Sequence, residues 1–391
     1  MHPSPTVAHV GRILVAAALA VPAVALTGGP ATAAVSETAR RTASFNGPVH
    51  VVEYAGPVMY VGGDFTRATN TDGTTVRRRN VAAIDVRSGR LLRWNPRANG
   101  TVQSLDLARG RVYLGGEFTR MGGARRARLA AVSKDGRGAL VRAFRHRANS
   151  GVNALTVRYG RIYVGGSFTK VDGRTRRHLA AFNLRTGALD RRWRPSTDGS
   201  VLALAARSRR VYVAGLFPRL NDRAAHGYLG AVGISRGRIA RSFNPVARYP
   251  FQDIALTRRA VYAAGDGPGG HLHKFSVRGA NRWTRATNGG VQAVEVLGRR
   301  VYAGGHFTEL CDTARVRGRG ECSDGSVKRR KVFAVGKDGR RLGWSPEANS
   351  TVGVRTIAVH RRRNLVTIGG DFTQLGVPDN PTDWAHIAQF R

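Results

Sequence analysis

An eight-residue pattern recurs along this chain and constrains its fold more than any other feature. It combines an aliphatic or aromatic run, a Gly doublet, a variable residue and Phe-Thr, as in MYVGGDFT from Met59 to Thr66. Clear copies begin at Val112, Ile162 and Val301, and weaker copies begin at Val211, Val261 and Val366. The first doublet position falls at residues 62, 115, 165, 214, 264, 304 and 369. The period is therefore about 50 residues, which is typical of propeller blades rather than helical solenoids.

A complete repeat offers four short strands, which we name A to D from the axis outward. In the second repeat we expect them at residues 102–108, 111–118, 129–133 and 139–144, with the tight turn Arg109-Gly110 between the first two. Seven repeats of this kind predict an all-β, seven-bladed β-propeller.

The two ends of the repeat region complement each other. The last repeat has candidates for strands A, B and C at residues 354–359, 364–372 and 386–390, and no strand D follows them. Residues 41–47 (RTASFNG) match a strand D and its turn, with no strand C before them. We therefore predict that the last blade is closed by the N-terminal strand, which leaves no open edge in the ring.

The repeat also resembles a known family. The sequence GG-x-FT, an Arg-rich loop, Leu-Ala-Ala at strand C (residues 129–131 and 179–181), Trp-x-Pro and Asn-Gly is similar to the delta-60 repeat of exported bacterial β-propellers, and it is kelch-like. The resemblance covers nearly all of the chain after residue 40 and is clearest in the first three repeats and the sixth. It implies the propeller fold on an exported protein and implies no shared chemistry.

The N-terminus has the features of a secretory signal peptide. Arg12 precedes an apolar run from Ile13 to Leu26, and Ala31-Thr32-Ala33 fits a small-residue cleavage site. We expect a signal peptide at 1–33, a short linker at 34–40 and a single propeller at 41–391. The mature chain would have no membrane span and would be secreted, extracellular or associated with the cell envelope. A membrane anchor is disfavoured because the run is shorter than the roughly 20 residues that a spanning helix needs.

The chain has two cysteines, Cys311 and Cys322, in the long loop between strands B and C of the sixth repeat. Two close cysteines in an exported protein predict a disulfide. A metal site at this pair is disfavoured, because no further Cys or His-rich segment lies nearby in the sequence.

The charge balance is extreme, with 64 Lys and Arg against 24 Asp and Glu and a formal net charge of +40. A surface this basic attracts polyanions and releases them as salt rises. Arg clusters precede strand C and are expected to ring one face. The predicted polyanion-binding residues are Arg77, Arg78, Arg79, Arg125, Arg126, Arg128, Arg176, Arg177, Arg329 and Arg330. Aromatic residues are scarce among them, so nucleic acid would bind only nonspecifically.

A second candidate site lies at the mouth of the axial channel, where strand A begins. The residue at the equivalent position is polar in six repeats and is Leu202 in the remaining one. The predicted ligand-binding residues are His50, Gln103, Asn153, Gln252, Gln292 and Arg355. Such a ring suits a sugar or another small polar ligand, and it equally suits ordered water alone.

Acidic residues keep two further hypotheses open. Glu53, Asp106 and Glu295 lie three residues further along strand A, where a carboxyl could act in general acid–base catalysis together with His50 and Arg355. The acids that follow the doublets suggest Ca²⁺, but they lack the spacing of a calcium loop. These acids are Asp64, Glu117, Asp266 and Asp371.

These observations favour a binding module over an enzyme. H-E-x-x-H is not present in the sequence, and the one G-x-S-x-G match, residues 233–237, is followed by no helical pattern and so does not indicate a nucleophile elbow. We predict a monomeric, non-enzymatic binding or scaffold module for anionic polymers of the cell envelope or matrix, with no catalytic residues, metal or cofactor. The alternative is a glycan-active lyase or hydrolase with an axial carboxylate site.

Overall fold

The computed structural model describes residues 35–391 except 225–226, 319 and 377–381. The described residues belong to one compact unit that spans Ala33–Arg391. The segment expected to be a signal peptide lies outside them. Within the described ranges, no helix is long and apolar enough to cross a membrane.

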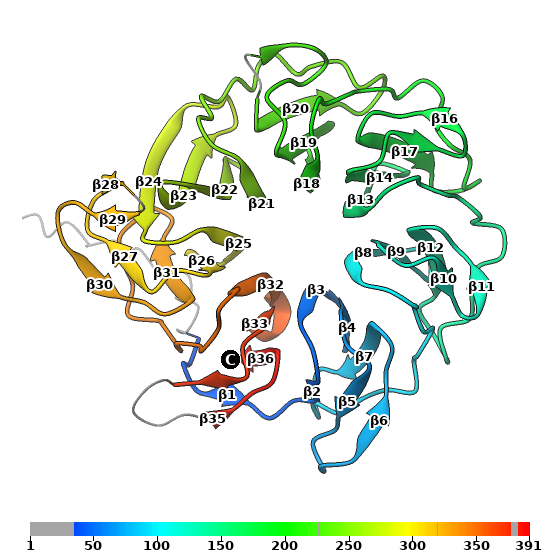
Figure 1. Ribbon diagram of the computed structural model, residues 1–391, viewed down its shortest axis with the longest axis horizontal. Helices are drawn as coiled ribbons and strands as arrows, with labels where there is room; N and C mark the ends of the chain where they lie inside the picture. The colour runs from blue at the N-terminus through cyan, green and yellow to red at the C-terminus, as the bar shows by residue number, and fades with distance from the viewer. Residues whose placement is uncertain (1–34, 225–226, 319, 377–381) are drawn as a thin grey trace, which may run out of the picture. The chain divides into compact units, whose positions relative to one another are not determined.

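Small antiparallel sheets surround a common centre, and the first strand of each repeat lies innermost (Figure 1). The inner strands are β3 (Val49–Ala55), β8 (Val102–Ala108), β13 (Val152–Arg158), β18 (Val201–Arg207), β21 (Phe251–Leu256), β25 (Val291–Leu297) and β32 (Val354–His360). Each contacts the inner strand of the next repeat, and β32 of the last repeat contacts β3 of the first.

The second and third strands complete a common three-stranded pattern. The second strands are β4 (Val58–Gly63), β9 (Arg111–Gly116), β14 (Arg161–Gly166), β19 (Arg210–Gly215), β22 (Ala260–Gly267), β26 (Arg300–Gly305) and β33 (Leu365–Gly370). The third strands are β7 (Val81–Asp85), β12 (Leu129–Ser133), β17 (Leu179–Asn183), β20 (Leu229–Gly233), β23 (Gly269–Ser276), β31 (Val332–Gly336) and β36 (Ile387–Phe390).

The loops between second and third strands contain further pairs of short antiparallel strands. They are β5 (Arg67–Thr69) with β6 (Thr75–Arg77), β10 (Arg120–Met121) with β11 (Ala124–Arg125), β15 (Lys170–Val171) with β16 (Arg174–Thr175), β27 (Glu309–Cys311) with β30 (Ser326–Lys328), β28 (Val316–Arg317) with β29 (Glu321–Cys322), and β34 (Gln374–Leu375) with β35 (Thr382–Asp383). One 3-10 turn, Arg361–Arg363, joins β32 to β33.

The fourth strand is shorter than the sequence predicts in most repeats. In the predicted segment 139–144, only Leu140 bridges to the third strand, at Val132. The chain then turns away, because Phe144 is buried against Tyr113 in the seam with the next repeat. The fifth repeat differs and forms a full fourth strand, β24 (Asn281–Thr287).

The N-terminal segment pairs with the last repeat two residues earlier than the predicted strand begins. Strand β1 (Ala39–Arg40) lies antiparallel to β36, with Ala39 opposite Phe390. Residues Ser44–Phe45, inside the predicted segment, instead form β2 and pair with β5. This register buries Phe45 against Phe65, with ring centroids 4.3 Å apart. Residues 39–40, expected in a linker, are therefore part of a sheet.

The two glycines of each doublet allow two different close contacts, one with a side chain and one with the backbone. A Cβ on the first glycine would collide with a Val side chain of the next inner strand, as at Gly115 with Val152. A Cβ on the second would collide with the backbone carbonyl that precedes the inner strand, as at Gly116 with Thr101. That carbonyl accepts a hydrogen bond from the amide that follows the doublet, at 2.9 Å for Glu117. The second position is accordingly Gly in every repeat, whereas repeats four and five carry Ala at the first.

The hydrophobic core lies in the seams between successive sheets. The Tyr of the repeat packs against the aromatic residue that follows the third strand, as Tyr60 does with Trp94 at 5.1 Å and 80°. Thr367 stands at this Tyr position in the last repeat and is fully buried. Its hydroxyl is 2.5 Å from the Tyr54 hydroxyl, which also accepts a hydrogen bond from Gln389. Polar contacts thus replace the aromatic pair in that seam.

The Thr of the repeat takes part in a clasp across five of the seams. The Asn99 side chain accepts the amides of Thr119 and Arg120 and donates to the Thr119 hydroxyl. The same clasp forms at Asn46–Thr66, Asn149–Thr169, Asn288–Thr308 and Asn349–Thr373. The sequence analysis gave these Asn residues no bonding role, although a fixed Asn-to-Thr spacing of 20 residues in four repeats was a usable signal.

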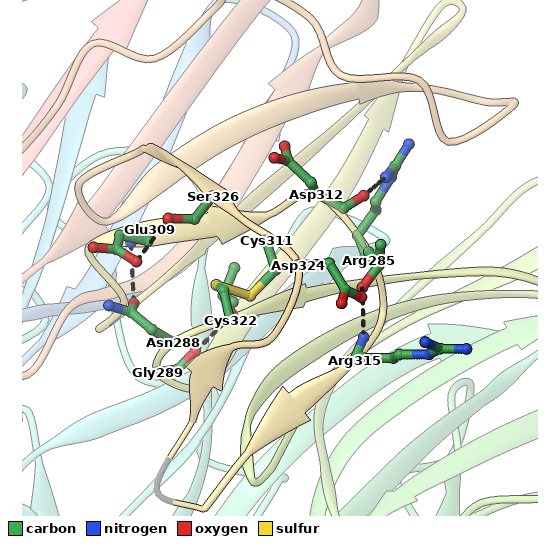
Figure 2. Close-up of a disulfide and its surroundings, with 12 residues drawn as sticks. Arg285, Asn288, Gly289, Glu309, Cys311, Asp312, Arg315, Cys322, Asp324 and Ser326 are labelled. Carbon is green, nitrogen blue, oxygen red and sulfur yellow. Dashed lines mark hydrogen bonds between the residues drawn. A yellow bond between two sulfur atoms is a disulfide. The ribbon is translucent and has the colours of Figure 1, made fainter.

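The predicted disulfide between Cys311 and Cys322 is confirmed, with a Cα–Cα distance of 5.2 Å. It lies in the long loop between β26 and β31, close to the hairpin of β27 and β30 (Figure 2). Glu309 in β27 accepts a hydrogen bond from Ser326 in β30 at 2.9 Å. The disulfide therefore closes a surface loop next to the paired strands β27 and β30.

We expect Gly116→Ala to be more damaging than Gly115→Ala. The first change forces a Cβ against rigid backbone and should lower the free energy of unfolding by about 3 kcal/mol or more, whereas the second meets movable side chains and should cost about 1–3 kcal/mol. Urea unfolding of both variants measures the difference. Equal losses would show that the backbone approach is not the limiting constraint.

Candidate functional site

A cavity of about 480 Å³ lies on the axis between the inner strands. Its lining includes all six residues predicted for the mouth, together with Leu202. The structure thus gathers into one cavity six side chains that are spread over about 300 residues of sequence.

A β-bulge in each inner strand aims these side chains at the cavity. In β3 the pairing with β4 shifts between Val49 and Val51, so His50 is the extra, unpaired residue. The same shift leaves the equivalent residue unpaired in the other inner strands. A bulge re-aims a side chain that regular alternation would send elsewhere. The mouth is therefore a product of the backbone of every repeat.

Two mouth residues contact side chains that follow the Gly doublets. Gln252 donates to Asp266 at 2.5 Å, and Gln292 lies 3.4 Å from His306. Burial, followed by the nearby positive charge of Arg355, lowers the pKa of His50 to about 4. At neutral pH the mouth therefore presents a neutral imidazole and amides around one arginine, which suits hydrogen bonding to a polar ligand.

Two carboxylates deeper on the axis tie adjacent inner strands together. Asp106 accepts the amides of Leu107 in its own strand and Val157 in the next, both at 2.6 Å. Asp253 accepts Ile254 at 2.8 Å and Val294 of the next strand at 2.9 Å. Innermost strands leave amides without ladder partners, and such buried groups require an acceptor. Asp253 was missed in the sequence because it lies one residue after the mouth position rather than three.

The axial acids share a low-dielectric, mutually repulsive environment. Burial raises the pKa of Glu295 to about 7 and that of Asp253 to about 6. Burial also raises the pKa of Glu53 well above its usual value, and the charges of Asp106 and Glu295 add to this rise. The Glu53 side chain is exposed to the channel, but the surrounding strands limit its solvation. These pKa shifts would suit a proton donor, and the amide contacts give Asp106 and Asp253 a structural role.

The acids that follow the doublets do not converge. Asp266 holds Gln252, Glu117 lies 3.6 Å from Arg128, and Asp371 accepts the Gly353 amide at 2.8 Å. Among the residues that the structure describes, no group of three or more His, Cys, Asp or Glu side chains is placed to hold a metal ion.

The predicted polyanion-binding arginines divide into two groups. Each member of the first group lies three residues before the third strand begins, and its Nη1 donates to the carbonyl of the residue before it, at 2.8–3.0 Å. The members are Arg78, Arg126, Arg176 and Arg329. Arg126 and Arg176 are only 7% and 5% exposed. These two predicted ligand contacts are therefore part of the fold, because their guanidinium groups are committed to loop carbonyls.

The second group is available to solvent. Arg77, Arg79, Arg125 and Arg177 are exposed, and none of them forms an ion pair with another described residue. Arg128 and Arg330 are half-buried, and Arg128 donates to the Ala148 carbonyl. Since second strands end and inner strands begin at the same edge of each sheet, this group lies on the face that bears the axial mouth.

We expect Glu295→Gln to stabilise the fold at high pH and to have no such effect at low pH. Because the pKa of Glu295 rises from 4.5 to about 7 on folding, its ionisation destabilises the fold as pH increases through that window. The variant should be about 1–2 kcal/mol more stable than the parent at pH 8 and should lose this advantage below pH 4.5. Urea unfolding at both pH values measures the difference. A pH-independent difference would contradict the shifted pKa.

No protein-family model matches the sequence, and no curated protein matches it. Solved structures resemble it in fold. The WD40 β-propeller domain of Doa1 is 9% identical, over 90% of this chain and 95% of that chain, with a TM-score of 0.57. The computationally designed Ika8 protein is 13% identical, over 90% and 99%, with a TM-score of 0.53. BamB from Moraxella catarrhalis is 12% identical, over 89% and 97%, with a TM-score of 0.49. At these identities the likeness to the first two structures establishes the fold alone, and the chain is a β-propeller.

Proposed function

We propose that this propeller is a secreted, non-enzymatic binding or scaffold module for anionic polymers of the cell envelope or matrix. The observation that carries the proposal is a net charge of +40 with exposed arginines that no described carboxylate neutralises. Guanidinium groups bind carboxylates and phosphates through paired, charge-assisted hydrogen bonds. Exposed, unpaired guanidinium groups on the mouth face suit a polymer that carries many such groups.

The proposal includes a seven-bladed ring of delta-60 type, closed by the N-terminal strand. Its support is the pairing of β1 with β36 and the contact between β32 and β3. Export is supported by the apolar leader in the sequence, and the disulfide is compatible with an oxidising compartment.

We expect binding to acidic polymers to depend strongly on salt and on the mouth-face arginines. The binding variant replaces four exposed arginines with Gln: Arg77, Arg79, Arg125 and Arg177. Titration of a polyuronate, a polyphosphate, a neutral glucan and duplex DNA at low and high salt should show binding of the polyanions alone. The affinity of the parent should fall by at least tenfold as salt rises, and the variant should show a shallower salt dependence.

The matched control removes the same charge from turns between first and second strands, at the opposite edge of the sheets. It replaces Arg209, Arg258, Arg259 and Arg362 with Gln. Equal weakening by both sets would reduce the proposal to diffuse attraction, and salt-resistant binding would contradict it. Binding of the neutral glucan would indicate a site that does not depend on charge, and the axial cavity would be the candidate.

The N-terminal closure has its own test. The parent for this test is the expected mature chain, residues 34–391. Deletion of residues 34–40 from it removes β1 and the buried Val35. We expect the free energy of unfolding to fall by about 2–4 kcal/mol, because hydrogen bonds and apolar burial on β36 are lost. An unchanged urea midpoint would argue against closure by this strand.

A further inference from the structure

Three successive seams share one backbone contact. The amide of a residue at the hairpin tip donates to the carbonyl of a residue 25 positions earlier, in the segment that enters the inner strand. The pairs are Gly122 to Arg97 at 3.0 Å, Asp172 to Arg147 at 2.9 Å and Asn221 to Ser196 at 2.8 Å. Gly122, Asp172 and Asn221 all have a positive φ, of 58°, 50° and 46°. These three tip residues are therefore structurally equivalent.

In two of these seams the tip side chain supplies an oxygen to the seam. Asp172 accepts the Arg147 amide at 2.9 Å with Oδ1 and contacts His146 Nδ1 at 2.6 Å with Oδ2. Asn221 accepts the Ser196 amide at 2.8 Å. Burial acts to raise the pKa of Asp172, but the His146 and Arg147 hydrogen bonds outweigh it and hold that pKa below its usual value. This seam therefore contains a stably ionised carboxylate.

In the seam between the first and second repeats the tip residue is Gly122, which has no side chain. The Arg97 amide holds the same place in the repeat as those of Arg147 and Ser196, and it has no acceptor within the described part of the chain. Arg97 differs from those two residues in having a positive φ, of 57°. A cavity of about 710 Å³ opens at this place. Its lining includes Gly122 and Asn95. Because Gly122 has no side chain, it supplies no oxygen of the kind that Asp172 and Asn221 supply in the other two seams.

The lining of this cavity is strongly basic. It contains four arginines, Arg78, Arg93, Arg97 and Arg137, and no Asp or Glu. The side chains of Arg93, Arg97 and Arg137 form no hydrogen bond or ion pair with any other described residue. Guanidinium groups gathered without a counter-charge favour an anion between them.

We propose that this cavity is a specific oxyanion site, in which a carboxylate, phosphate or sulfate group takes the position that the Asp172 carboxylate occupies in the next seam. One ligand oxygen accepts the Arg97 amide, and the arginines neutralise the remaining charge. The identity of the ligand as part of an acidic polymer rests on the proposed function, but a free oxyanion would bind whether or not a polymer does.

The test is to rebuild the internal carboxylate with Gly122→Asp. A Cβ at Gly122 meets only ordinary contacts, with Pro96 O at 3.5 Å and Leu140 Cβ at 3.9 Å, and Asp172 already adopts the same backbone conformation. Gly123→Asp is the matched control, since it adds the same charge at a neighbouring positive-φ glycine whose Cβ would face open space. Arg137→Gln is a second variant that leaves the turn unchanged.

The three variants and the parent are titrated with inorganic phosphate at low salt by calorimetry, and their melting temperatures are measured without phosphate. We expect Gly122→Asp to weaken phosphate binding by about tenfold or more and to raise the melting temperature, because its own carboxylate fills the site. Gly123→Asp should bind phosphate like the parent, and Arg137→Gln should bind it more weakly. Equal affinity of Gly122→Asp and Gly123→Asp, or no phosphate binding by the parent, overturns the proposal.

The same variants separate this site from the proposed function. If phosphate binds the parent and is lost in Gly122→Asp while no acidic polymer binds, the site stands and the polymer proposal fails. If the polymer binds the parent and both glycine variants equally, the polymer proposal stands and the site is not its anchor.

Discussion

At every inner strand, the carbonyl that precedes the strand lies against the α-carbon of the second glycine of the doublet. It accepts a hydrogen bond from the amide after the doublet, as Thr101 does from Glu117. This approach coincides with the bulge that leaves one inner-strand residue unpaired and turned toward the axis. A single backbone contact, repeated at each inner strand, therefore determines both the most restrictive residue of the motif and the residues that line the axial cavity.

The seams depend on a second set of contacts that are local to adjacent repeats. Aromatic pairs such as Tyr60–Trp94 fill the interior, and clasps such as Asn99–Thr119 join the loops at the rim. The axial carboxylates Asp106 and Asp253 join inner strands in the same way. Each repeat is thus stabilised mainly by its neighbours, as expected for an array in which one unit cannot bury its apolar faces alone.

Much of this architecture could be predicted from the sequence, because strand periodicity and the doublet are local signals. Strands β8 and β12 begin and end where the pattern placed them, and the six mouth residues share one cavity. The reduction of most fourth strands to a single bridge could not be predicted, because aromatic residues such as Phe144 pack in the seam, and this packing depends on the next repeat. Likewise, the run Arg77-Arg78-Arg79 gives no sign that the middle side chain folds onto a loop carbonyl while its neighbours remain in solvent.

The hairpin beside the disulfide belongs to two repeats at once. By sequence it is an insertion in the sixth repeat, but β27 pairs with β24, so the fifth sheet continues through β27 and β30 into a six-stranded sheet (Figure 1). Exchange of the sixth repeat for a copy of another by recombination would therefore remove two strands from the fifth and uncover the edge of β24. The same contact recurs as a single bridge from Ala98 to Met121 and from Ala148 to Val171, so a repeat inserted at any of these places would have to restore it on both of its sides.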